Sequence, residues 1–121
     1  MKAISNLGVR NGFLKLIGEN MEEIKRINVE QAQKMLQVTQ VTIVDARDPA
    51  SYHSSHIENA IMVSDENIEG FLENTAKDKP LICYCYHGFS SQNLAAFFLQ
   101  NGFKDVYSID GGFEAWERAS L

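Results

Sequence analysis

The sequence predicts a single α/β domain in which helices cover a mainly parallel β-sheet. Short runs of β-branched and other apolar residues recur without polar alternation, as expected for strands buried on both faces of a sheet. Segments with helical spacing or helix-capping residues alternate with these runs over residues 28–118. A chain of 121 residues with 45% apolar and 22% charged residues suits one globular domain.

The first predicted element is a helix that begins after Asn28, a favourable N-cap residue. Its apolar residues follow helical spacing and form one stripe, made by Val29, Ala32, Met35 and Leu36. Continuous apolar runs predict four strands, at residues 41–45, 60–63, 81–85 and 106–109. Further helices are predicted at residues 50–55, 67–74, 91–101 and 113–118, the third of them stopped by Gly102.

Residues 1–20 are expected to lie outside the domain, which we place at residues 21–121. The first part of this segment contains Lys2, Arg10 and Lys15 but no acidic residue, and glycines interrupt any helix. It holds no apolar block long enough for a signal peptide. We interpret the segment as a disordered extension or a start-site artefact.

Charge and cysteine content disfavour several function classes. The chain has 11 basic and 16 acidic residues, a net charge of −5, and no Lys/Arg block, which disfavours nucleic acid and anionic membrane surfaces as partners. No stretch approaches the roughly 18 apolar residues of a membrane-spanning helix. Cys83 and Cys85 are poorly spaced along one strand to bridge each other, which favours a reducing compartment, and we expect a cytoplasmic location.

The carboxyl ends of the predicted strands are the expected place for a site, because ligands of open parallel sheets bind there. Three residues with chemical potential end strands: Asp45, Cys85 and Asp110. Of these, only Cys85 is a nucleophile. It is followed by a short loop that contains Gly88 and then by the predicted helix at residues 91–101.

This loop favours a reactive thiolate at Cys85. A short loop with a glycine directs its backbone N–H groups toward its centre, and the helix N-terminus adds positive potential. Such surroundings lower the pKa of a cysteine from about 8.5 to roughly 3.5–7.5. The alternative interpretation is that Cys85 is a small apolar residue at the end of a buried strand. Cys83 lies deeper on the same side of the strand and is interpreted as a core residue.

Four segments, in order, resemble the rhodanese family of sulfurtransferases. They are VDARDP at residues 44–49, HIENA at 56–60, CYHGFSS at 85–91 and YSIDGGFEAW at 107–116. The likeness extends from about Met21 to the end of the chain. Two residues depart from the family pattern: Phe89 stands where a polar residue is more usual, and Asn59 where many members have glycine.

The resemblance implies a rhodanese-like three-layer sandwich with a five-stranded, mainly parallel sheet and helices on both faces. It also implies a thiosulfate sulfurtransferase that needs neither cofactor nor metal. Sulfane sulfur would move from thiosulfate to Cys85 as a persulfide, and then to cyanide or a thioredoxin-type dithiol. The binding loop would comprise Tyr86, His87, Gly88, Phe89, Ser90 and Ser91. The alternative is a non-catalytic rhodanese-like sulfur carrier or protein-interaction module.

Residues around the loop are assigned supporting roles. Asp45 and Arg47 are expected to form an ion pair that fixes the neighbouring loop, and His56 to make a structural hydrogen bond. Ser90 and Ser91 are expected to cap the following helix, with a hydrogen bond to the persulfide as the alternative role. Many rhodaneses carry Arg or Lys inside the loop. The only residue of this loop that can carry a positive charge is His87, which predicts weak binding of a dianionic donor.

Two other site chemistries are disfavoured by spacing. Phosphatases and arsenate reductases with a comparable loop use Cys-x5-Arg, and here Ser91 stands in the arginine position. A zinc site could draw on Cys83, Cys85, His53, His56 and His87. However, a Cys-x-Cys pair held in a strand separates its sulfurs poorly for a tetrahedral metal.

Overall fold

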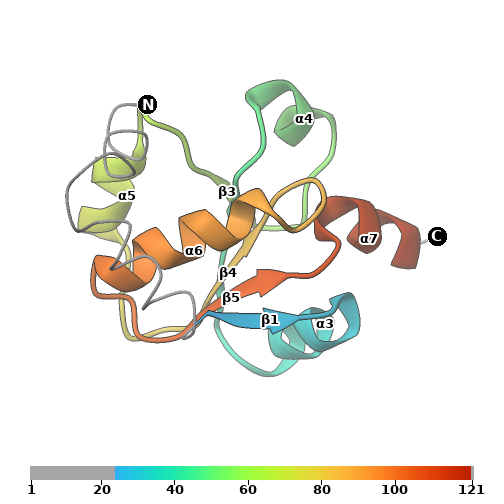
Figure 1. Cartoon of the computed structure of the whole chain (residues 1–121), viewed down its shortest axis with the longest axis horizontal. Helices are drawn as coiled ribbons and strands as arrows, with labels where there is room; N and C mark the ends of the chain where they lie inside the picture. Colours follow the sequence, from blue (N-terminus) through green and yellow to red (C-terminus); the bar gives the residue numbers. More distant parts are fainter. Residues whose placement is uncertain (1–23, 121) are drawn as a thin grey trace.

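The computed structural model describes residues 24–120, so the interpretation of residues 1–20 lies outside the described residues. Its elements follow the alternation that the sequence predicts (Figure 1). In chain order they are β1 (Lys25–Ile27), α3 (Val29–Val38), β2 (Thr42–Asp45), α4 (Pro49–Ser54), β3 (Ile61–Met62), α5 (Ile68–Asn74), β4 (Leu81–Tyr84), α6 (Ser90–Gln100), β5 (Val106–Ile109) and α7 (Gly112–Ala119).

The five strands form one sheet in the order β1-β5-β4-β2-β3, and every pairing is parallel. This confirms the predicted five-stranded sheet and makes it wholly parallel. The strand that the sequence analysis did not place is β1, which pairs with β5 so that Ile27 lies opposite Ile109. It is an edge strand of three residues, and only Ile27 is buried.

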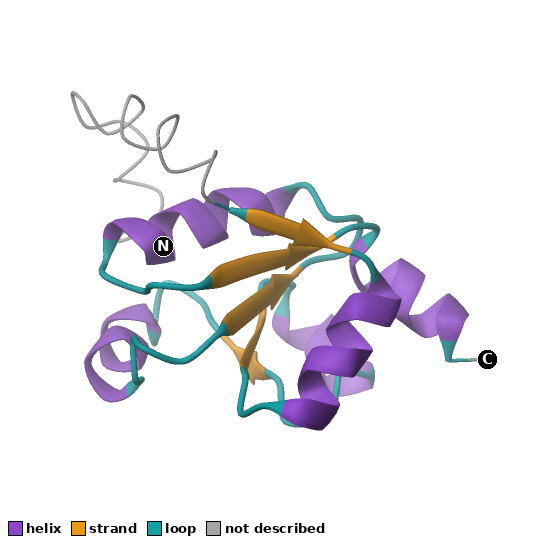
Figure 2. Cartoon of the chain, turned by 90° about the horizontal axis from the view of Figure 1, so that it is seen from below, coloured by secondary structure: helices purple, strands orange, loops and turns teal. Residues whose placement is uncertain are grey.

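Helices cover both faces of the sheet (Figure 2). Side chains of β4 alternate between two apolar clusters: Leu81 and Cys83 pack toward α5 and α6, while Ile82 and Tyr84 pack toward α3 and α7. All four residues of β4 are at most 1% exposed. Cys83 is therefore a core residue, as predicted.

Local signals explain where the first helices begin. Asn28 and Gln31 form a capping box at α3, in which each side chain accepts from the other residue's backbone N–H, at 2.8 and 2.9 Å. Asp48 accepts from the Ser51 N–H at 3.1 Å and caps α4, whose first residue is Pro49. The predicted helix at residues 50–55 is thus shifted by one residue toward the N-terminus.

The boundaries around residue 85 also differ slightly from the prediction. Strand β4 ends at Tyr84, so Cys85 is the first residue of the loop, and α6 begins at Ser90. No helix among residues 24–120 is long and apolar enough to span a membrane.

We expect Phe98→Ala to lower the free energy of unfolding by about 3–5 kcal/mol, because it leaves a cavity in the cluster beneath α6. Phe98 is fully buried, and its ring centroid lies 5.4 Å from that of Phe71 and 5.2 Å from that of Phe103. Urea denaturation measures the change. Phe89→Ala is the control, since Phe89 is 77% exposed and should change stability by less than about 0.5 kcal/mol. Equal losses for both variants would contradict the packing described above.

Candidate active site

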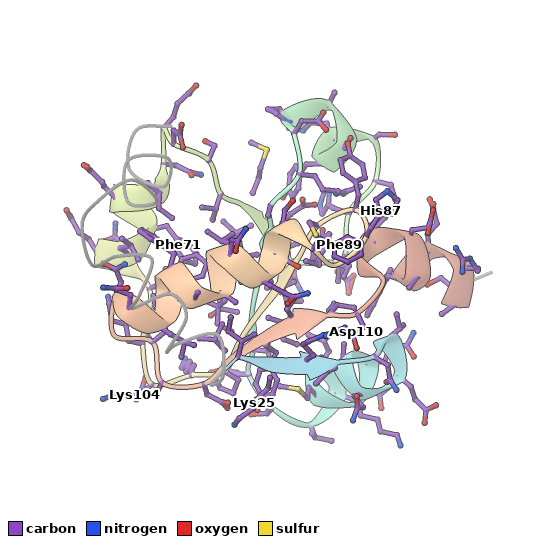
Figure 3. All side chains as sticks on the ribbon, viewed as in Figure 1. Lys25, Phe71, His87, Phe89, Lys104 and Asp110 are labelled. Carbon is purple, nitrogen blue, oxygen red and sulfur yellow. The ribbon has the colours of Figure 1, made fainter. Side chains whose placement is uncertain are left out.

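Cys85 lies at the carboxyl edge of the sheet, where the chain leaves β4 and turns into α6. The labelled His87 and Phe89 lie on this turn, at the N-terminal end of α6 (Figure 3). The backbone N–H groups of Gly88 and Ser91 donate to the Cys85 Sγ at 3.2 and 3.3 Å. The Ser91 Oγ lies 3.3 Å from the same sulfur. Cys85 as a whole residue is only 4% exposed. The sulfur faces the donors that the sequence analysis expected.

The hydrogen bonds around Cys85 favour its thiolate. Burial raises the pKa of the Cys85 thiol, but hydrogen bonds from the Ser91 hydroxyl and from the backbone of Ser91, Gly88 and His87 outweigh burial, and the pKa falls below its ordinary value. The pKa of Cys83 moves the other way, raised first by burial and then by the charge of Cys85. The pKa values of the two cysteines are therefore shifted in opposite directions, and only the surroundings of Cys85 favour a thiolate.

The loop is held in place by the N-terminus of α7. The Phe113 N–H donates to the Cys85 carbonyl at 2.7 Å, and the Glu114 N–H donates to the Tyr86 carbonyl at 3.1 Å. The approach is so close that a Cβ on Gly112 would lie 2.4 Å from the Cys85 oxygen. Gly88 has a φ of 95°, and a Cβ there would lie 2.8 Å from the Gly111 nitrogen. Glycine is thus required at both positions.

The predicted ion pair between Asp45 and Arg47 is present and buried. The Arg47 Nη2 lies 2.8 Å from the Asp45 Oδ2, and the side chains are 3% and 0% exposed. The same carboxylate accepts from the Tyr84 hydroxyl at 2.6 Å, and the Tyr84 oxygen in turn accepts from the Ile57 N–H at 3.2 Å. Arg47 also donates to the Ser55 carbonyl at 2.6 Å. This network joins the β2–α4 segment to β4, the strand that directly precedes Cys85.

Cys85 lines a cavity of about 330 Å³ between the loop and the β2–α4 segment. Its lining residues are Ala46, Arg47, Asp48, Cys85, Tyr86, His87, Phe89 and Ser90. Among these described residues Arg47 is the only Lys or Arg, and its charge is already paired with Asp45. Phe89 stands on the rim, largely exposed. The cavity therefore offers an incoming anion little positive charge.

The Asp48 carboxylate adds negative charge to the lining of this cavity. The Tyr86 hydroxyl hydrogen-bonds to Asp48 and to the Ser51 hydroxyl. The bond from Tyr86, followed by those from Ser51, lowers the pKa of Asp48 to about 2, so it stays ionised at neutral pH. His87 also lines the cavity, and its Nδ1 lies 3.7 Å from the Glu114 carboxylate.

The structure brings the whole predicted loop together but corrects the role given to two serines. The N-cap residue of α6 is Phe89, and no side chain caps the helix there. Ser90 and Ser91 are instead its first two residues, and the buried Ser91 hydroxyl is directed toward the Cys85 sulfur. Backbone N–H groups that bond to the sulfur do not need a side-chain cap. This explains why the capping prediction was wrong.

His56 makes the predicted kind of hydrogen bond, away from the loop. Its Nδ1 lies 2.7 Å from the Tyr52 carbonyl oxygen, and its ring stacks on Tyr52 with centroids 3.9 Å apart. His53 is exposed, as expected. Within residues 24–120, no group of three or more His, Cys, Asp or Glu side chains is arranged to hold a metal ion.

Sequence reasoning missed Tyr84, Asp48 and Ser108 as neighbours of the site. Ser108 is 1% exposed, and its Oγ lies 2.8 Å from the Ser91 Oγ. Its only signal in the sequence is a lone serine within an apolar strand. Nothing local pairs it with Ser91, because the contact arises from the packing of α6 against β5.

A family model described as Rhodanese-like domain matches residues 28–119. The chain belongs to the rhodanese-like family. Two curated relatives, from Vibrio cholerae and Pseudomonas syringae, are both named thiosulfate sulfurtransferase GlpE. The first is 43% identical over 101 residues, which cover 84% of this chain and 95% of the relative. The second is 47% identical over 96 residues, which cover 79% and 90%.

A solved structure confirms the rhodanese-like fold class at the level of topology. It is a protein of unknown function from Rhodopseudomonas palustris, described as a possible tyrosine phosphatase. The two chains superpose with a TM-score of 0.72 at 25% identity, covering 87% of this chain and 88% of the other. A rhodanese-like domain protein from Staphylococcus aureus also superposes on this chain, with a TM-score of 0.68 at 26% identity, covering 77% of this chain and 91% of the other.

We expect Arg47→Met to lower the free energy of unfolding by about 3–5 kcal/mol, because it leaves the Asp45 carboxylate buried without its partner. Chemical denaturation at neutral pH measures the loss. Arg118→Met is the matched control: it removes an exposed pair with Glu114, at 3.1 Å, and should cost less than about 1 kcal/mol. A similar small cost for both variants would show that the buried network contributes little.

Proposed function

We propose that this chain is a thiosulfate sulfurtransferase that carries sulfane sulfur as a persulfide on Cys85. The observation that carries the proposal is the Cys85 sulfur, nearly enclosed and hydrogen-bonded by two backbone N–H groups and a serine hydroxyl. These donors favour an anion at this position. The names of the curated relatives support the same activity and the same donor.

In the first step, the Cys85 thiolate attacks the outer sulfur of thiosulfate. A bond forms between the two sulfurs, the S–S bond of thiosulfate breaks, and sulfite leaves with the bonding electron pair. The hydrogen bonds of the loop lower the pKa of Cys85 and so increase the fraction of the reactive thiolate. No proton needs to move in this step.

In the second step, an acceptor attacks the outer sulfur and Cys85 leaves as thiolate. When cyanide is the acceptor, it takes the outer sulfur and leaves as thiocyanate. A thioredoxin-type dithiol would take the sulfur with one thiol and release it as sulfide when its second thiol closes a disulfide. The N–H donors that stabilise the attacking thiolate also stabilise it as the leaving group, since the same anion is present at both ends of the cycle. Two free cysteines suit a reducing compartment, and we propose the cytoplasm as the place of this reaction.

Phosphate-ester hydrolysis, suggested by the description of the Rhodopseudomonas palustris protein, fits this loop less well. Such enzymes bind the phosphoryl oxygens with an arginine six residues after the cysteine. Ser91 occupies that position here, and its hydroxyl is already engaged with the Cys85 and Ser108 side chains. The loop therefore lacks the bidentate cation that phosphate recognition needs.

Treatment with thiosulfate in the absence of reductant should add one sulfur atom to the protein, as measured by intact mass spectrometry. Cys85→Ala should show no addition, because it lacks the thiolate. Cys83→Ala is the matched control and should still gain the sulfur, since Cys83 is a buried core thiol. Absence of the adduct from the wild-type protein would count against the mechanism. Unchanged cyanide-dependent turnover in Cys85→Ser would favour the non-catalytic module instead.

Phe89→Arg should lower the KM for thiosulfate about fivefold, because a unit charge near the dianion contributes about 1 kcal/mol at the exposed rim. Steady-state assays with cyanide as acceptor measure the change. Phe89→Gln is the control and should leave the KM close to that of the wild type. The gain should shrink at high ionic strength, since exposed charges are screened. A KM insensitive to the new charge would mean that the donor does not pass the rim at residue 89.

A further inference from the structure

Two buried serines lie one behind the other at the Cys85 sulfur. The Ser91 Oγ lies 3.3 Å from the Cys85 Sγ and 2.8 Å from the Ser108 Oγ. Ser91 is fully buried and Ser108 is 1% exposed. Ser108 comes from β5, so this chain of polar atoms runs from the sheet, through the first turn of α6, to the nucleophile.

The protonation state of the sulfur dictates the direction of these hydrogen bonds. A hydroxyl group has one proton to donate and two lone pairs that accept. Because a thiolate can only accept, the Ser91 proton must point at the sulfur when Cys85 is ionised. The Ser91 oxygen is then free to accept, and Ser108 can donate to it. When the sulfur carries its proton, both of these bonds can reverse, with the thiol donating to Ser91 and Ser91 donating to Ser108.

We propose that Ser108 is a positioning residue whose hydroxyl keeps the Ser91 proton directed at the ionised Cys85 sulfur. The proposal rests on the proposed function for its catalytic consequence, although the geometry stands without it. A hydroxyl that accepts a hydrogen bond becomes a better donor, so the Ser108 bond strengthens the one from Ser91 to the sulfur. Ser108 has no contact with the reacting atoms and acts only through Ser91.

Other charged and titratable groups lie around the site, and the test leaves them unchanged. They are Cys83 on β4, Tyr86 and His87 in the loop, Arg47 and Asp48 in the β2–α4 segment, and Glu114 on α7 beside His87. None of them lies in the hydrogen-bond path from Ser108 to Cys85. A change in Cys85 titration on removal of the Ser108 hydroxyl alone would therefore report that path.

The experiment measures the Cys85 thiolate fraction as a function of pH. The readout is the rate at which iodoacetamide alkylates Cys85 in the folded protein. Ser108→Ala should raise the Cys85 pKa by about half a unit, equivalent to about threefold less thiolate at low pH. Ser91→Ala should raise it further, by about one unit, since the direct donor is lost. No sulfur donor is present, so this readout does not depend on the proposed sulfur transfer.

A double variant tests whether Ser108 acts through Ser91. Ser91→Ala combined with Ser108→Ala should titrate like Ser91→Ala alone, because the path is already broken. Additive shifts would overturn the proposal. Tyr107→Phe, which removes a hydroxyl from the same strand outside the site, should titrate like the wild type.

A second pair of variants keeps the test valid if the alanine substitution disturbs packing. Ser108→Thr and Ser108→Val add the same shape to the buried position and differ only in the hydroxyl group. Ser108→Thr should retain more of the wild-type titration than Ser108→Val, and cyanide-dependent turnover below the Cys85 pKa should follow the same order. Identical titration curves for the two variants, or a wild-type curve for Ser108→Ala, would overturn the proposal.

Discussion

An anionic sulfur that is almost removed from water requires protein donors in place of its hydration shell. Burying a charge without such partners is costly enough that the group would take up a proton instead. Here two backbone N–H groups and one hydroxyl face the Cys85 sulfur at 3.2–3.3 Å. The features around the loop serve this requirement, because each of them keeps those donors directed inward.

Two features hold the loop, namely the backbone contacts from α7 and the buried Asp45–Arg47 pair. On one side, α7 approaches it backbone to backbone, which is why Gly112 and Gly88 cannot carry a side chain. On the other side, the buried Asp45–Arg47 pair fixes the β2–α4 segment, and the Arg47 guanidinium lies 4.1 Å from the centre of the Phe113 ring on α7. Arg47 thereby links both features. Because the Arg47 charge is already paired with Asp45, the cavity beside Cys85 offers little positive charge to an anionic substrate.

Sequence reasoning succeeded where the determining forces are local. The apolar run of β4, the glycine after Cys85 and the helix that follows are neighbours in the chain, so spacing alone located Cys85 and its loop. It failed where the answer depends on tertiary packing. Strand β1 was missed because only Ile27 of its three residues is buried, and the orientation of Ser91 was missed because its partner Ser108 lies on a different strand. The close approach of Gly112 to the backbone of Cys85 was missed because these residues are far apart in the sequence.

The position of α7 in the chain has a consequence for how the protein is made. The loop at residues 85–89 is synthesised before residues 113 and 114, whose N–H groups donate to the carbonyl groups of Cys85 and Tyr86. Figure 1 shows α7 beside this loop. A nascent chain that has reached only β5 holds the cysteine but not the backbone contacts that fix its surroundings. The surroundings of Cys85 are therefore complete only once the residues of α7 have been added to the chain.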